Sequence, residues 1–501
     1  MLGKKIKGFL LFFWFFIEKA NIFCYIKIER TILHILIPVI RRKEILKIFD
    51  LSPGKYIHFI GIGGISMSSL ALIVKHGGYK VSGSDIIETH ITKKLQENGI
   101  EVFIGQSEKN INSPDLVVYT AAISKDNPEY IEAVKQAKKV VERSVFLGEL
   151  MKAYGCPCCI AGTHGKTTTT SMVSSIMLEA QKDPTVLVGG EVKALGGNLK
   201  IGSSEIFVTE ACEYVESFLE FFPKKAIILN VDADHLDYFK DIDHIISAFK
   251  KFAQLVPESG SLIVNGADKN TIKATKDLKC NIITFGIGED FDVQAKNVVF
   301  DKNGFASYDL IAFGVKLCSI TLSVPGKHNV LNSLAAAAMC LDTGCDAVSV
   351  KNGLENFKGT DRRFEIKGEY KGCTIVDDYA HHPTEIVAAI KTAKNFGHKK
   401  VTAIFQPHTY TRTKALLGEF AQSLSLADRV IVTDIYAARE IDDGTVSSKD
   451  LVDIMVKTGC DAKYIKDFDD VAEHIKKTCS GDELIMTVGA GPVYKIGEKL
   501  I

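Results

Sequence analysis

Short apolar runs, each followed by a glycine-containing turn and a helical stretch, recur along this chain. Tyr56–Ile60 is the first run, and Gly61-Ile62-Gly63-Gly64 separates it from a predicted helix over Ile65–His76. The pattern restarts at Cys158–Ala161, ahead of a predicted helix from Lys166 to about Ala180. Strands that alternate with helices in this way predict parallel β-sheets with helices on both faces.

The pattern restarts often enough to divide the chain. At 501 residues the chain is too long for a single hydrophobic core. Further buried strands are predicted at Leu116–Thr120, Phe207–Glu210, Ala226–Asn230, Thr374–Asp377, Val401–Phe405, Val430–Thr433 and Leu484–Thr487. Three restarts predict three α/β domains, over residues 51–156, 157–358 and 359–501.

Residues 1–50 do not share this pattern and form a hydrophobic extension. Lys4, Lys5 and Lys7 precede the apolar run Phe9–Ile17, which is too short to span a bilayer. A second apolar stretch, Ile32–Ile40, is flanked by arginines. Three interpretations stay open: a basic segment on a membrane surface, a packed extension, or upstream sequence included by a wrong start codon, which we favour. Membrane contact is expected only if the extension is part of the protein.

Charge and cysteine content narrow the class of protein. Lys+Arg and Asp+Glu both number 61, so no excess of positive charge points to nucleic acid as a partner. Cys156-Pro157-Cys158-Cys159 resembles a metal or redox cluster, but no second Cys/His pair follows at zinc-finger spacing. We interpret these residues as buried thiols. Reduced thiols predict a cytoplasmic protein, and no pattern indicates an oligomeric state.

The segment Gly162-Thr163-His164-Gly165-Lys166-Thr167 carries the strongest chemical signal. It lies between a predicted strand and a predicted helix, where backbone N–H groups and the helix N-terminus bind nucleotide phosphates. Lys166 is expected to reach the outer phosphates of ATP, and the Thr167 hydroxyl is expected to coordinate Mg²⁺. Ile160 occupies the first glycine position of the common motif, so this is a variant phosphate loop.

A second glycine turn, Gly61-Ile62-Gly63-Gly64-Ile65-Ser66, comes close to the dinucleotide-binding fingerprint. Ser66 stands where the third glycine belongs, and Asp85 stands where a ribose-binding acid follows the second strand. The residues leave three interpretations open: binding of NAD(P), binding of another nucleotide diphosphate, or only a tight turn between strand and helix.

Acidic residues end two strands that follow the phosphate loop. Glu210 ends the first, and His235 closes the segment Asn230-Val231-Asp232-Ala233-Asp234-His235 after the second. Because the carboxyl ends of parallel strands face the ligand crevice, Glu210 and His235 are expected to complete Mg²⁺ coordination with Thr167. The alternative is a helix cap or a solvated acid.

The C-terminal third offers Asp361-Arg362-Arg363, Asp377–Pro383 and Gln406–Arg412. A planar guanidinium group suits phosphate and carboxylate binding, so Arg362 and Arg412 are candidate clamps. Surface salt bridges are the alternative.

Taken together, these segments resemble the Mur ligase family from about Lys55 to the C-terminus. The motifs, in family order, are Gly61–Gly64, Gly162–Thr168, Ala233–His235, Pro325–Asn329, Gly359–Phe364, Asp377–Pro383 and Phe405–His408. The resemblance implies a Rossmann-like UDP-binding domain, a central P-loop ATPase domain and a Rossmann-like C-terminal domain. The hydrophobic extension lies outside it.

The resemblance also assigns residues to ligands. The UDP part of the substrate is expected at Gly61, Gly63, Gly64, Ser84 and Asp85. ATP is expected at Gly162, Thr163, His164, Gly165, Lys166, Thr167, Thr168, His328, Asn329, Asn332, Arg362 and Asp378. The amino acid is expected at Tyr379, His381 and Arg412, and the residues expected to act in catalysis are Lys166, His235, Arg362, His381 and Arg412.

The implied reaction is ATP-dependent ligation of L-alanine to the lactyl carboxylate of UDP-N-acetylmuramate through an acyl phosphate, in cytoplasmic peptidoglycan precursor synthesis. His381 is a candidate base for the amine. Two departures from the family pattern matter: Cys212 replaces a common acid, which leaves the geometry of a second metal open, and Thr409 replaces a second arginine of some relatives.

Three rival functions predict different chemistry. A murein-tripeptide recycling ligase joins a tripeptide to the same acceptor. An NAD(P)-linked oxidoreductase binds nicotinamide at the first glycine turn and releases no phosphate. A non-catalytic nucleotide-gated regulator has no need of Lys166, Glu210, His235 and Arg362 together.

Overall fold

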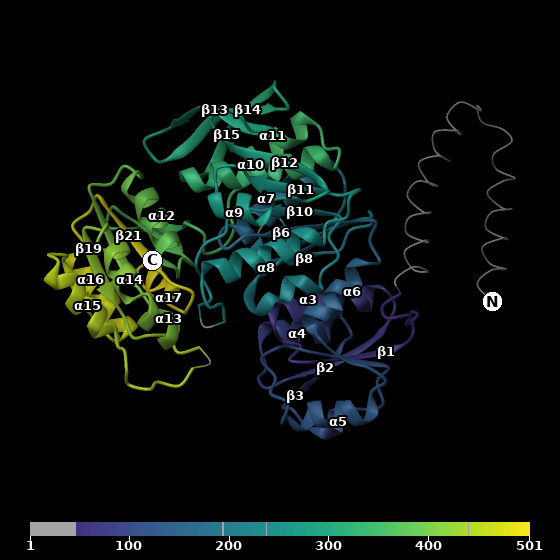
Figure 1. Cartoon of the computed structure of the whole chain (residues 1–501). Coiled ribbons are helices and arrows are strands. Elements are labelled where there is room, and N and C mark those ends of the chain that lie inside the picture. The colour runs from purple at the N-terminus through teal and green to yellow at the C-terminus, as the bar shows by residue number, and fades with distance from the viewer. Residues whose placement is uncertain (1–46, 193–194, 237, 439) are drawn as a thin grey trace, which may run out of the picture.

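The protein is described by a computed structural model that covers residues 47–192, 195–236, 238–438 and 440–501. Three β-sheets, each with its own helices, confirm the predicted three α/β domains. The N-terminal and C-terminal domains lie on different sides of the central one (Figure 1). Residues 1–46, most of the predicted extension, lie outside the described residues. Ile48, at the start of the described chain, is fully buried, and the carbonyl of Leu51 accepts a hydrogen bond from the Tyr79 hydroxyl at 2.7 Å.

The N-terminal domain is a five-stranded parallel sheet in the order β3-β2-β1-β4-β5. Its strands are β1 (Tyr56–Ile60), β2 (Lys80–Asp85), β3 (Glu101–Ile104), β4 (Leu116–Tyr119) and β5 (Val140–Glu142). Its helices are α3 (Ile65–His76), α4 (His90–Glu97), α5 (Pro128–Gln136) and α6 (Arg143–Met151), with a short 3-10 turn at Glu108–Asn110.

The central domain is a ten-stranded mixed sheet in the order β15-β14-β13-β12-β11-β10-β6-β9-β7-β8. Its strands are β6 (Cys156–Ala161), β7 (Thr185–Val192), β8 (Gly197–Lys200), β9 (Ile206–Glu210), β10 (Lys225–Ile228), β11 (Ser261–Asn265), β12 (Asn281–Ile287), β13 (Val293–Phe300), β14 (Phe305–Ala312) and β15 (Val315–Pro325). Its helices are α7 (Lys166–Glu179), η3 (Tyr214–Glu220), α8 (Ile242–Gln254), α9 (Lys269–Ala274), α10 (Lys327–Asp342) and α11 (Ala347–Glu355).

The C-terminal domain is a six-stranded sheet in the order β16-β17-β21-β18-β19-β20, parallel except for the β16–β17 pair. Its strands are β16 (Glu365–Tyr370), β17 (Cys373–Asp378), β18 (Lys400–Phe405), β19 (Arg429–Val432), β20 (Ala462–Tyr464) and β21 (Glu483–Val488). Its helices are α12 (Pro383–Lys394), α13 (Tyr410–Ala415), α14 (Leu417–Leu424), α15 (Ser448–Lys457), α16 (Phe468–Thr478) and α17 (Tyr494–Glu498).

Strand β6 is buried on both faces, as expected for the middle of a parallel sheet. Cys159 belongs to one hydrophobic cluster and Cys158 to a second one on the opposite face of the sheet, because successive strand residues point to opposite faces. Both thiols are fully buried, which confirms the interpretation of this segment as core. All cysteines in the described part of the chain are free thiols.

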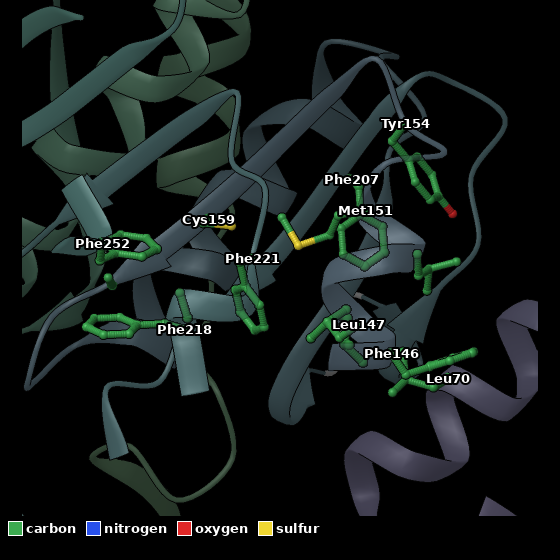
Figure 2. Packing of buried hydrophobic residues seen from close by; sticks show 14 of the residues in the cluster. Leu70, Phe146, Leu147, Met151, Tyr154, Cys159, Phe207, Phe218, Phe221 and Phe252 are labelled. Atoms are coloured by element: carbon green, nitrogen blue, oxygen red, sulfur yellow. The ribbon is translucent and has the colours of Figure 1, made fainter. Parts of the chain in front are cut away.

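One continuous core joins the N-terminal and central domains, and helix α6 lies in its middle (Figure 2). The ring of Phe146 on this helix meets that of Phe59 edge-on at 5.6 Å, and the ring of Tyr154 lies 4.8 Å from that of Phe207 in β9. Full burial of each such side chain contributes about 1.5–3 kcal/mol. The buried clusters of the C-terminal domain instead draw on residues from Phe364 onward. The first two domains are therefore fixed to each other by apolar packing.

The antiparallel arm β13–β15 was not predicted from the sequence. Its strands pair through two hairpins with register shifts, and β15 forms the edge of the sheet. Such irregular pairing interrupts the strict alternation of apolar and polar residues on which strand prediction depends. Among the described residues, no helix is both long and apolar enough to cross a membrane.

Candidate active site

The phosphate loop lies between β6 and α7, at the carboxyl end of the central parallel strands. Gly162 and Gly165 have φ angles of 138° and 88°, which side chains other than glycine rarely adopt. A Cβ on Gly165 would also lie 2.7 Å from Oδ1 of Asn332. Asn230 clamps the loop, because its Oδ1 accepts the His164 N–H at 2.8 Å and its Nδ2 donates to the His164 carbonyl at 3.0 Å.

Lys166 begins helix α7 and folds back over the loop. Its ammonium group donates to the Gly162 carbonyl at 2.6 Å, to the Thr163 carbonyl at 3.1 Å and to Oε2 of Glu213 at 2.9 Å. Desolvation lowers the pKa of Lys166, but the charge and hydrogen bond of Glu213, together with the charges of Cys212 and Glu210, outweigh desolvation and raise the net pKa. Glu213, only 2% exposed, was missed as a site residue, although it closes the acidic segment that begins at Glu210.

Two of the three predicted metal ligands come together. The Thr167 hydroxyl donates to Oε2 of Glu210 at 3.1 Å, and Oε1 of Glu210 accepts the Gly189 N–H at 2.6 Å. His235 instead lies beside Glu213, with 3.9 Å between Nε2 and Oε1. The hydroxyl and carboxylate oxygens of Thr167 and Glu210 are the donors that Mg²⁺ prefers, so these residues fit the ion.

A cavity of about 480 Å³ adjoins the loop and extends to the C-terminal domain. Seven of the residues predicted to bind ATP line it: His164, Gly165, Thr168, His328, Asn329, Asn332 and Asp378. Leu229, Phe285 and Phe357 add apolar surface of the kind that an aromatic base packs against. Burial raises the pKa of Asp378 to about 6, although Arg363 and two backbone N–H donors act in the opposite direction.

Arg362, which is expected at the ATP phosphates, makes its contacts inside the C-terminal domain in this structure. Its Nε donates to Oδ2 of Asp377 at 2.9 Å, and its NH2 group donates to the carbonyls of Gly489 at 2.6 Å and Gly491 at 3.0 Å. These acceptors hold the guanidinium within the C-terminal domain. The neighbouring Arg363 lines the cavity instead. Because Arg362 has a positive φ of 61°, the chain turns sharply at the point where the two arginines diverge.

The C-terminal domain reaches the phosphate loop through His164. Nε2 of His164 lies 3.2 Å from Oδ2 of Asp232, and Nδ1 lies 3.2 Å from Oε1 of Glu385 at the start of α12. Burial opposes protonation, but the hydrogen bonds to these two carboxylates raise the pKa of His164 to about 9. His164 is therefore a doubly donating cation that joins two domains.

The residues predicted to bind the amino acid lie beside the same seam. NH2 of Arg412 lies 3.4 Å from Oδ1 of Asp234. Burial raises the pKa of Asp234, but the charges of His235 and Arg412 outweigh it and lower the pKa to about 2. The ring of His381 lies 5.4 Å from that of Tyr379, and the charges of Arg412 and Asp234 act on His381. The Tyr379 ring itself lies 4.9 Å from the guanidinium carbon of Arg362.

One group of three clustered metal-ligand side chains occurs among the described residues: His164, Asp232 and His382. It differs from the predicted set of Thr167, Glu210 and His235. Nε2 of His382 donates to the Ala233 carbonyl at 2.9 Å, and His164 donates to two carboxylates. These donors already have hydrogen-bond partners, so we assign no metal to this group.

The N-terminal glycine turn, residues 61–64, folds over the end of β2. Oδ2 of Asp85 accepts the Gly63 N–H at 2.9 Å. Ser84 is fully buried: its hydroxyl donates to Oε2 of Glu129 at 2.6 Å, and its carbonyl accepts the Gly61 N–H at 2.8 Å. Ser84 therefore shapes the turn from beneath, and its expected role in binding the UDP group stays a prediction.

The fold and the site together define a three-domain enzyme that binds a nucleoside triphosphate at a phosphate loop, with its third domain docked on that loop. Three family models match the chain: Mur ligase family, catalytic domain, over residues 56–155; Mur ligase middle domain, over 160–340; and Mur ligase, glutamate ligase domain, over 362–491. The chain belongs to the Mur ligase family, whose members are ATP-dependent.

Two relatives match nearly the whole described chain. The chain is 51% identical over 452 residues to the UDP-N-acetylmuramate–L-alanine ligase of Caldanaerobacter subterraneus subsp. tengcongensis, covering 90% of this chain and 98% of that protein. It is 50% identical over 459 residues to the ligase of the same name from Acetivibrio thermocellus, covering 91% and 98%.

Two solved structures of ligases superpose on most of this chain. A crystal structure of UDP-N-acetylmuramate–alanine ligase from Thermotoga maritima superposes with a TM-score of 0.74 at 32% identity, covering 89% of this chain and 98% of that one. A murein peptide ligase from Psychrobacter arcticus superposes with a TM-score of 0.68 at 25% identity, with the same coverage.

Proposed function

We propose that this protein ligates L-alanine to the lactyl carboxylate of UDP-N-acetylmuramate, with ATP converted to ADP and phosphate, in peptidoglycan precursor synthesis. The observation that carries the proposal is the similarity at about half identity, over nine-tenths of the chain, to ligases of that name. The murein peptide ligase is the less similar relative, at 25% identity, which favours alanine over a tripeptide. The nucleotide and the UDP-linked acceptor imply action in the cytoplasm.

The three predicted domains receive separate roles in this proposal. Residues 51–156 bind the UDP group at the turn 61–64, with Asp85 bracing the turn. Residues 157–358 bind ATP, with the phosphates on the loop and the base in the adjoining cavity. Residues 359–501 bring the amino acid, through Tyr379, His381 and Arg412. Ligation requires all three to meet, so domain docking is part of the reaction.

Phosphoryl transfer is the first step. A lactyl carboxylate oxygen attacks the γ-phosphorus of ATP, ADP leaves, and an acyl phosphate forms. Lys166 is placed to exchange Glu213 for phosphate oxygens, and Arg363 reaches the cavity from the C-terminal domain. Thr167 and Glu210 would hold Mg²⁺, which would supply positive charge to the phosphate oxygens. Fixed cations of this kind act by positioning and electrostatics, with little covalent chemistry required of the protein.

Amide formation is the second step. The amine nitrogen of alanine attacks the acyl carbon, a proton leaves the nitrogen, and the C–O bond to phosphate breaks. The guanidinium of Arg412 is the candidate partner for the alanine carboxylate, and Asp234 holds that guanidinium in the structure. Nε2 of His235 lies 3.9 Å from a carboxylate oxygen of Glu213 and 3.9 Å from one of Asp234, and in this proposal it orients the lactyl carboxylate.

The test is phosphate release from ATP and UDP-N-acetylmuramate with one amine at a time. L-alanine is expected to give release with a matching amount of alanylated UDP product. Phosphate release with glycine or L-serine in place of L-alanine measures how selective the amino-acid site is for alanine. Release only with the tripeptide, or at the same rate without any amine, contradicts the proposal.

A further inference from the structure

Glu385 stands at the meeting point of two domains and two histidines. It lies in the first turn of α12, with a side chain that is 13% exposed. Oε1 meets Nδ1 of His164 in the phosphate loop at 3.2 Å. Oε2 accepts the backbone N–H of His381 at 3.1 Å and lies 3.4 Å from Nδ1 of the same residue. One carboxylate therefore touches the ATP half and the amino-acid half of the site at once.

The contacts of His381 define which of its ring nitrogens is free. Nδ1 lies 3.0 Å from the carbonyl oxygen of Tyr379, which only accepts hydrogen bonds. Nδ1 therefore carries the hydrogen, and Nε2 keeps its lone pair. Burial lowers the pKa of His381, while Glu385 acts in the opposite direction, so the ring is neutral at neutral pH. This is the protonation state that a base requires before amine attack.

Oε1 of Glu385 is held in place by His164 of the phosphate loop. The His164 backbone is clamped by Asn230, so its imidazole is a fixed point of the loop. The residue pair His164 and Glu385 is separated by 221 positions in the chain and by the domain boundary. Glu385 keeps both contacts only while the C-terminal domain is docked on the central one.

We propose that Glu385 is a positioning residue: it turns Nε2 of His381 toward the alanine amine, and His164 of the phosphate loop holds it in that position. This role rests on the proposed function, in which His381 is the base, and it identifies the contacts that orient the His381 ring. On amine attack the N–C bond forms, Nε2 of His381 takes the amine proton, and the acyl C–O bond breaks as phosphate leaves. The resulting imidazolium is paired with Glu385. The His381 base is therefore fully oriented only when the C-terminal domain docks on the phosphate loop and Glu385 contacts His164.

The test separates the two chemical steps in a single turnover. Glu385→Gln and wild-type protein are mixed with saturating ATP, UDP-N-acetylmuramate and alanine, and quenched rapidly, and ADP and alanylated product are measured in each sample. The variant is expected to form its first equivalent of ADP at close to the wild-type rate. Product formation is expected to fall by about 100-fold, the lower range for loss of a general base. Acyl phosphate accumulates and is trapped by borohydride reduction.

Thr384→Ala is the matched control. The Thr384 hydroxyl donates to Oδ2 of Asp232 at 2.8 Å, across the same seam and next to Glu385 in sequence, and no contact joins its hydroxyl to His381. Loss of docking alone slows ADP and product formation by one common factor, and this is the result expected for Thr384→Ala. If Glu385→Gln is not recovered folded, Glu385→Asp serves, because the shorter side chain fails to bridge His164 and His381.

The outcomes are distinct. ADP formation retained with product formation lost supports the inference. A common loss of both steps in the Glu385 variant, or a loss of neither, overturns it. If the wild-type protein forms no alanylated product, the proposed function fails, whatever the variant does.

Discussion

Replacement of Lys166 by methionine is expected to cost stability as well as turnover. The Glu213 carboxylate is 2% exposed, and the Lys166 ammonium is its ion-pair partner at 2.9 Å. Removing one partner of a buried pair leaves an uncompensated charge and costs about 3–5 kcal/mol. In a domain of this size, that loss lowers the melting temperature by roughly 10 °C. Turnover is expected to fall at least about 1000-fold, because the charge that stabilises phosphoryl transfer is gone.

The double variant Lys166→Met/Glu213→Gln separates the two effects. It removes both charges, so most of the lost stability is expected to return, with a coupling energy of about 2–3 kcal/mol in a double-mutant cycle. Turnover is expected to stay lost. Thermal unfolding and phosphate release are measured on the wild-type protein, on Lys166→Met, on Glu213→Gln and on the double variant. Additive stability effects contradict the buried pair, and turnover that recovers with stability contradicts the phosphate role of Lys166.

Three further predictions test other parts of the site. Glu210→Gln is expected to raise the Mg²⁺ concentration for half-maximal turnover at least about 10-fold, because one of the two side chains proposed to hold the ion loses its charge. An unchanged Mg²⁺ dependence excludes Glu210 as a ligand. The folded-state pKa of His164, about 9, lies above its unfolded value of about 6.5, so its stabilisation is complete below about pH 6.5 and is lost as pH rises through about 9. The difference in unfolding free energy between wild-type protein and His164→Asn is expected to shrink over that range, and a pH-independent difference contradicts the ion pairs. Gly148→Ala places a Cβ 1.9 Å from the Glu220 carbonyl oxygen, and overpacking at the α6–η3 contact is expected to destabilise the protein by more than about 1–3 kcal/mol in denaturant unfolding.

The parts of the fold that depend on local spacing were predictable from the sequence. The expected strand Tyr56–Ile60 and helix Ile65–His76 agree with β1 and α3, and α7 begins at Lys166 as expected. In each case an apolar strand runs into a glycine turn and a helix follows, and this signal depends only on residues that are close in sequence. The pairing of Thr167 with Glu210 was also predictable, because adjacent parallel strands end at the same edge of the sheet.

Side-chain contacts across domains were not predictable in this way. Glu385 reads as an ordinary acid in the first turn of a helix, where it complements the helix dipole. Its contact with His164 joins positions 221 apart and exists only after two domains have folded and docked. Likewise, nothing in the dipeptide Arg362-Arg363 indicates which guanidinium faces the cavity, because the positive φ at the first residue arises from the folded turn.

The central claim is that ATP activates a carboxylate of the UDP-linked acceptor for attack by L-alanine. The most direct test uses UDP-N-acetylmuramate with heavy oxygen in its lactyl carboxylate, and measures the label in the phosphate released during ligation. One carboxylate oxygen passes into the acyl phosphate and leaves with phosphate, so one labelled oxygen per phosphate is expected, in step with alanylated product. Unlabelled phosphate released at the rate of product formation contradicts the account.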